Sequence, residues 1–145
     1  MADIYTELHG YLRGQAAVAS AVGSGTAARI FPDVPKQNAA LPFIVLVESG
    51  GGDSIEHLSG LAGFAQATFH VYAYDSSRAA ANSLAEVVRL AGPFQTFAGA
   101  MGTRRVQVNG VQHRDSGVDT PTDKNDQLRY WTRKTYLLWY DEPTS

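Results

Sequence analysis

Residues 64–74 alternate between two kinds of side chain, and this period of two is the strongest constraint on the fold. The first set is small or apolar, namely Ala65, Ala67, Phe69, Val71 and Ala73. The second set is polar or aromatic, namely Gln66, Thr68, His70, Tyr72 and Tyr74. Because successive side chains of a β-strand point to opposite faces, the pattern predicts a strand whose small-apolar face packs on a helix. The polar-aromatic face is expected to point outward or toward a neighbour.

Three other segments have the character of strands. Residues 43–48 begin with an unbroken apolar run, which predicts a strand buried on both faces. Thr103 to Val111 predicts a third strand, and Tyr130 to Tyr140, dense in Trp, Tyr, Thr and Leu, predicts the last one. Arg29-Ile30-Phe31 is a candidate for a short extended piece between prolines.

Two amphipathic patterns predict helices, over residues 3–22 and residues 78–91. Asp3 is a candidate N-cap of the first helix, and Gly23 is a candidate for the residue just past its end. Gly10 and Gly14 lie inside this helix and each costs about 1 kcal/mol relative to alanine, so the helix needs tertiary packing. Asp75-Ser76-Ser77 offers N-caps for the second helix, which Gly92-Pro93 closes.

The resulting order is α-β-β-α-β-β. It predicts an α+β fold with two helices packed on one face of a mostly antiparallel four-stranded sheet. We expect a single domain over residues 1–145, with a short polar tail at 141–145. Ser49–Leu61 is expected to be a flexible loop because it is rich in glycine, and Gln112–Gln127 because it is polar and acidic.

Composition excludes several classes of protein. The net charge is −2 and the isoelectric point about 6.0, which argues against a globally basic nucleic-acid binder. The chain has no cysteine, so disulfides and thiolate metal sites are excluded. The longest apolar run, Phe43 to Val47, is far shorter than the roughly 20 residues that span a membrane. The N-terminus has neither the basic nor the apolar region of a signal peptide.

No motif for catalysis or cofactor binding stands out. The four histidines lack metal-ligand spacing, and no serine lies in a nucleophile elbow. Gly50-Gly51-Gly52 follows a strand but has no Lys-Ser/Thr pair after it, so a loop tip is favoured over a phosphate cradle. Asp123-Lys124-Asn125-Asp126 lacks the glycine and the closing glutamate of a calcium loop. We therefore expect a protein that is not an enzyme and carries no cofactor or metal.

The residues that favour an interaction surface are aromatic and basic. Tyr72, Tyr74, Tyr130 and Trp131 are candidate anchors of a subunit interface, and each is equally compatible with packing in the core. Arg104-Arg105 is a candidate for pairing with carboxylates across a subunit boundary, and an exposed strand face is the alternative.

The chain resembles a family of small proteins of tailed phages, the tail completion or tail terminator proteins, which are structurally similar to the phage lambda tail terminator. The resemblance rests on Arg29-Ile30-Phe31-Pro32, Pro35 and Leu41-Pro42-Phe43-Ile44-Val45. It continues through Gly60 to Gly63, the strand ending in Tyr72-Ala73-Tyr74-Asp75, and the helix after Ser76.

This resemblance implies a structural protein of the virion, assembled in the host cytoplasm. Six copies would form a ring that caps the tail tube, stops its polymerisation and joins it to the head-neck connector or stopper, while DNA passes through the lumen. The homo-hexamer, the tail tube protein and the connector are the implied partners, with no membrane. The two predicted loops would contact the lumen or adjoining rings through Asp53, Glu56, Asp115, Asp119, Asp123 and Asp126. Alternatives are another neck or tail ring component and a small binding domain unrelated to phages.

Overall fold

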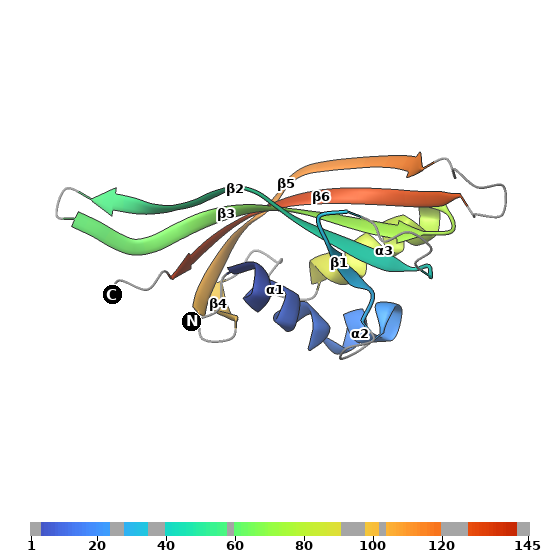
Figure 1. Ribbon diagram of the computed structural model, residues 1–145, viewed down its shortest axis with the longest axis horizontal. Coiled ribbons are helices and arrows are strands. Elements are labelled where there is room, and N and C mark those ends of the chain that lie inside the picture. The colour runs from blue at the N-terminus through green and yellow to red at the C-terminus, as the bar shows by residue number, and fades with distance from the viewer. Residues whose placement is uncertain are drawn as a thin grey trace.

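The computed structural model describes residues 4–23, 28–34, 40–57, 60–90, 98–101, 104–119 and 128–141. Its helices all lie on one side of a twisted sheet, which confirms the α+β class and the single helical layer (Figure 1). The helices are α1 (Ile4–Arg13), α2 (Ala16–Val22) and α3 (Arg78–Leu90). The strands are β1 (Ile30–Pro32), β2 (Phe43–His57), β3 (Gly60–Asp75), β4 (Ala98–Met101), β5 (Arg104–Asp119) and β6 (Arg129–Asp141).

The sheet has six strands in the order β1-β2-β3-β6-β5-β4, so the predicted four-stranded sheet is wrong. The four predicted strands are its centre, and their neighbours pair antiparallel as expected. The short β1 adds a parallel strand beside β2, and β4 adds an antiparallel one beside β5. The extended piece predicted at Arg29-Ile30-Phe31 is confirmed as β1, although its place in the sheet was not predicted. The four residues of β4 are too few for a side-chain period to reveal them.

Both predicted loops are strands over the residues that the structure describes. The pairing of β2 with β3 continues to His57↔Gly60, through three register shifts between Glu48 and Glu56. Glycine in a strand is tolerated where a bulge interrupts the ladder, which is why Gly50-Gly51-Gly52 does not end β2. Likewise, β5 runs on to Asp119 because β6 pairs with it along its length. Residues 120–127 of the second predicted loop lie outside the described residues.

The predicted first helix is two helices, which is a correction. The amide of Gly14 lies 3.2 Å from Gly10 O and 3.1 Å from Tyr11 O, and Gln15 N bonds to Leu12 O. The bonds to Tyr11 O and Leu12 O span three residues and tighten the last turn of α1, and a new helix begins at Ala16. Gly23 follows α2 with a φ of 94° and donates to Ala19 O, which confirms the predicted helix end. Asp3 lies outside the described residues.

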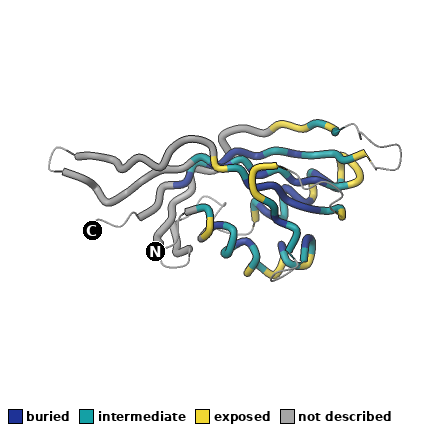
Figure 2. Tube along the Cα trace, in the orientation of Figure 1, coloured by how far each residue is buried: buried dark blue, intermediate teal, exposed yellow. Residues whose placement is uncertain are grey.

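Two apolar clusters stabilise the sheet, one on each face. The larger joins all three helices to β1, β2, β3 and β6, and it contains Phe69, Val71 and Ala73 from the alternating strand. The smaller lies on the opposite face around Phe43, Val45 and Tyr74. Residues 43–46 are therefore buried on both faces, as predicted, with Ile44 and Leu46 in the larger cluster. Figure 2 shows this buried stretch where the helices underlie the sheet.

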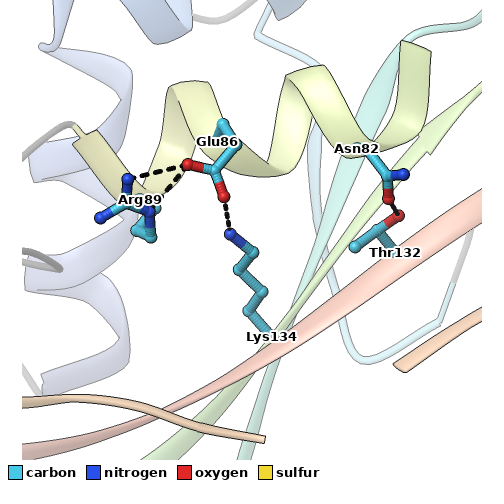
Figure 3. A network of polar contacts seen from close by, with 5 residues as sticks. All are labelled: Asn82, Glu86, Arg89, Thr132 and Lys134. Atoms are coloured by element: carbon cyan, nitrogen blue, oxygen red, sulfur yellow. Dashed lines mark hydrogen bonds and ion pairs between the residues drawn. The ribbon is translucent and has the colours of Figure 1, made fainter. Parts of the chain in front are cut away.

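Helix α3 is held to β6 by polar contacts as well as apolar ones (Figure 3). Ser77 Oγ caps its first turn by accepting from Ala80 N at 3.1 Å, as the sequence predicts. Lys134 forms an ion pair with Glu86, and Thr132 Oγ1 donates to Asn82 Oδ1 at 2.6 Å. Hydrogen bonds from Arg89 and Lys134 lower the pKa of Glu86 from 4.5 to about 2. Among the described residues, no helix is long and apolar enough to cross a membrane.

Candidate interaction surface

The face of the sheet opposite the helices carries aromatic rings, arginines and carboxylates in register. Tyr72 on β3 lies opposite Arg133 on β6, which in turn lies opposite Asp115 on β5. Tyr74, Trp131 and Gly117 form the next such row. These residues alternate with the ones that pack on the helices, so their side chains share the outer face. We call Phe43, Tyr72, Tyr74, Arg129, Trp131 and Arg133 the arginine–aromatic face.

Arg129 covers the buried part of this face. Its guanidinium carbon lies 5.8 Å from the ring centre of Phe43 and 5.7 Å from that of Tyr74. Phe43 and Tyr74 stack on each other with ring centres 4.7 Å apart. On its other side, Arg129 Nη2 lies 3.5 Å from Asp119 Oδ2. The chain thus places one of its own cations over the aromatic rings. The electron-rich faces of these rings attract the guanidinium.

Arg133 makes the same two kinds of contact, with an aromatic ring and a carboxylate, in the neighbouring row. Its guanidinium carbon lies 5.9 Å from the ring centre of Tyr72, and its Nη2 lies 3.5 Å from Asp115 Oδ2. Arg133 Nε is buried and has no hydrogen-bond partner within the part of the chain that the structure describes. Arg133 thus holds its guanidinium between the Tyr72 ring and the Asp115 carboxylate.

The two remaining large aromatic side chains on this face differ from Tyr74 in exposure. Tyr74 is only 5% exposed, whereas Tyr72 and Trp131 are half-buried. Burial, and after it the nearby Asp119 carboxylate, raises the pKa of Tyr74 from 10.0 to about 12. Tyr74 therefore keeps its phenolic proton at neutral pH and belongs to the core of the smaller cluster. Tyr72 and Trp131, with ring centres 5.5 Å apart in an edge-on contact, remain accessible.

The structure separates the other residues that the sequence singled out. Tyr130 is half-buried and alternates with Trp131, so it lies on the helix side of β6. Arg104 and Arg105 begin β5 and pair with Met101 and Ala100 of β4, and their side chains lie outside the described part. Asp53 and Glu56 belong to β2, again with side chains outside the described part. Asp123 and Asp126 lie wholly outside the described residues.

Asp115 and Asp119 lie in β5 and not in a loop, which corrects their predicted setting. Each carboxylate faces an arginine of β6, so the negative charge expected of this segment is partly neutralised within the sheet. Sequence reasoning missed Arg129 and Arg133. The alternation of Arg129, Trp131 and Arg133 at every second residue is the signal that could have identified them.

Comparisons with known proteins agree on a class. A family model described as tail completion protein gp17 matches residues 6–120. Among solved structures, a chain from the "Virion of native gene transfer agent (GTA) particle" superposes with a TM-score of 0.62. That chain is 15% identical in sequence, and the match covers 94% of each chain. No curated protein matches the sequence.

Proposed function

Since this chain belongs to the family of the tail completion protein gp17, we propose that it completes the tail of a phage or phage-like particle as a terminator subunit. Six copies form a ring on the end of the tail tube, stop its polymerisation and connect it to the head-neck connector or stopper. DNA passes through the lumen of this ring. The protein is assembled in the host cytoplasm, becomes part of the virion, and catalyses no reaction in this role.

The family match over residues 6–120 carries this proposal, because it includes most of the helical layer and the five described strands that begin before residue 120. The fold likeness to a chain of a virion particle supports it over nearly the whole length. The family match supports a role as another ring component of the neck or tail equally well. The position of the protein in the particle distinguishes this role from that of a tail terminator.

The arginine–aromatic face offers suitable chemistry for a contact between subunits. Tyr, Trp and Arg are the residue types that dominate the binding energy of protein interfaces. Here Tyr72 and Trp131 are half-buried, and the Arg129 and Arg133 side chains beside them are 28% and 25% exposed. A ring requires heterologous contacts, in which two different surfaces of the subunit meet, so this face would supply one of the two.

Native mass spectrometry of the purified protein, alone and with isolated tail tubes, tests the proposal. Six copies of a 15.6 kDa chain correspond to about 94 kDa. Electron microscopy of labelled protein should then place it at one end of the tube. A chain that stays monomeric at high concentration and does not bind tube ends contradicts the terminator role. Binding elsewhere on the particle favours the alternative ring component.

A further inference from the structure

The two edges of the sheet are protected to very different degrees. At the β1 edge, His9 Nε2 lies 3.1 Å from Ile30 O. Two residues further on, Pro32 has no amide hydrogen to donate. Its carbonyl accepts a hydrogen bond from Val34 N at 2.6 Å. Past the end of β1, β2 is the outermost described strand on this side, and its pairing with β3 contains three register shifts. Proline and bulges are the devices with which proteins prevent a sheet edge from pairing with another strand.

Over the described residues, the β5 edge carries fewer of these devices, namely two register shifts, between Val108 and Val111 and between Val111 and His113. β4 pairs only with Arg104–Gln107, and no strand of the described residues runs along the outer side of Val111–Asp119. This stretch contains neither proline nor lysine. Its pairing with β6 is regular from His113 to Asp119, so this part of the edge carries no register shift. Val118 is 44% exposed, which is unusual for a valine in a strand. An open edge of this length is a template for another strand.

The charges along this edge determine which kind of strand can pair with it favourably. The side chain of Asp115 is 52% exposed and that of Asp119 is 33% exposed. Their contacts with Arg133 and Arg129 are 3.5 Å long, beyond the roughly 2.7–2.9 Å of a close charge-assisted hydrogen bond. Asp119 also accepts a hydrogen bond from Tyr74, but both carboxylates keep exposed surface at which a second cation can bind. They are four residues apart and lie on the same face of the strand.

A second copy of the same strand fits poorly. Antiparallel self-pairing centred on Gly117 would place Asp115 opposite Asp119 of the other copy, twice. Like charges directly opposite each other in neighbouring strands are destabilising. A strand with basic residues at these positions gains two favourable cross-strand pairs instead.

We propose that the outer edge of β5, Val111–Asp119, binds an extended segment of another protein that carries lysine or arginine at two positions four residues apart. Backbone hydrogen bonds to the open edge hold the segment, and its two cations face Asp115 and Asp119. This mode of recognition, strand addition, draws affinity from the main chain and specificity from alternate side chains. The inference does not depend on the hexameric ring, because it needs only one subunit with an uncovered β5 edge.

Two short synthetic peptides test the proposal on the full-length chain. Both are rich in Thr and Val, and one carries two lysines four residues apart where the other carries glutamates. Fluorescence anisotropy should detect binding of the lysine peptide and none of the glutamate peptide at the same concentrations. Hydrogen exchange should become slower in residues 111–119 on binding, with no change in residues 30–32. The double variant D115N/D119N should weaken lysine-peptide binding roughly five- to tenfold, which is the effect expected of two lost cross-strand pairs.

The control variant is D33N, which removes a carboxylate beside the protected β1 edge. Asp33 has a φ of 63°, a conformation that asparagine also tolerates, so this substitution is expected to preserve the fold and the peptide affinity. Circular dichroism establishes that all variants are folded. Equal affinity for both peptides, unchanged affinity in D115N/D119N, or protection at a different strand overturns the proposal. A dimer of the chain alone in which hydrogen exchange slows at residues 111–119 would also overturn it, in favour of self-pairing of β5. Ring assembly, measured separately by native mass spectrometry, is unaffected by these outcomes.

Discussion

The indole of Trp131 lies directly against Gly117 on the neighbouring strand. A methyl group at residue 117 would stand 2.5 Å from Trp131 Cζ2 and 2.7 Å from Cε2. Contacts this short do not occur between real side chains, so only glycine permits the present position of the indole. The edge-on contact of Trp131 with Tyr72 depends on that position as well.

Substitution of Gly117 by alanine is expected to displace Trp131 and to lower the free energy of unfolding. Overpacking of this kind costs about 1–3 kcal/mol. Urea denaturation followed by tryptophan fluorescence measures both effects. G10A is the matched control, because a Cβ at Gly10 in α1 meets nothing within 4 Å. It should raise stability by about 0.5–1 kcal/mol through helix propensity. Equal changes in the two variants would contradict the steric explanation.

Substitution of Trp131 by alanine should reduce hexamer formation more than it reduces folding of the subunit. The side chain is half-buried, so we expect a loss of about 2 kcal/mol, less than that of a fully buried aromatic residue. F69A supplies the comparison, because Phe69 is fully buried and its loss should cost about 3–5 kcal/mol. Denaturation curves and native mass spectra of both variants separate the two effects. Unfolding of W131A under native conditions would make Trp131 a core residue.

Replacement of Arg133 by lysine tests the stacking on Tyr72 apart from the charge. Lysine retains the positive charge near Asp115 but lacks the planar guanidinium that lies over the aromatic ring. We expect a loss of about 0.5–1 kcal/mol in the free energy of unfolding. In the Y72A background the same replacement should have a much smaller effect, and a double-mutant cycle measures this coupling. Additive effects would show that the stacking contributes nothing.

The Glu86–Lys134 pair should make part of the stability dependent on acidic pH. The pKa of Glu86 is lowered to about 2 from 4.5, so its contribution is complete above pH 4.5 and is lost as the pH falls toward 2. Lys134 is 5% exposed, so E86Q leaves a buried ammonium without its anion and should destabilise the protein at pH 7. Urea denaturation should show that lowering the pH from 7 to 3 reduces the free energy of unfolding less in E86Q than in the native chain. K134M, which removes the buried charge, should be less harmful than E86Q at pH 7.

Tyr74 should contribute to unfolding at high pH. Its pKa is raised to about 12 from 10, so the stabilisation is complete below pH 10 and is lost as the pH rises toward 12. Ultraviolet absorbance titration should show Tyr74 ionising after the exposed tyrosines, and Y74F should shift the alkaline unfolding midpoint upward. An unchanged midpoint in Y74F would mean that another group, such as the buried Tyr136, limits alkaline stability.

Local patterns were sufficient for much of the fold. The alternation at residues 64–74 predicted which side chains of β3 face the helices, because a strand has a period of two wherever it lies. The apolar run Phe43 to Val47 predicted burial on both faces, which holds for residues 43–46, and Ser77 predicted the start of α3. The resemblance to tail completion proteins was carried by prolines, aromatics and the order of elements, and the family match supports it.

Tertiary structure alone decided the rest, because it depends on partners distant in sequence. Gly50-Gly51-Gly52 and Gly117 look like loop residues by themselves, yet β3 and β6 supply backbone hydrogen bonds that keep them in strands. The pairing of Asp115 with Arg133 and of Asp119 with Arg129 required the register of β5 and β6, which no local period specifies. The first helix was divided at Gly14, where packing of two short helices on the sheet outweighed a continuous amphipathic pattern. The sequence thus determined which residues can be strand, helix or core, whereas strand pairing determined which surfaces remain open to other proteins.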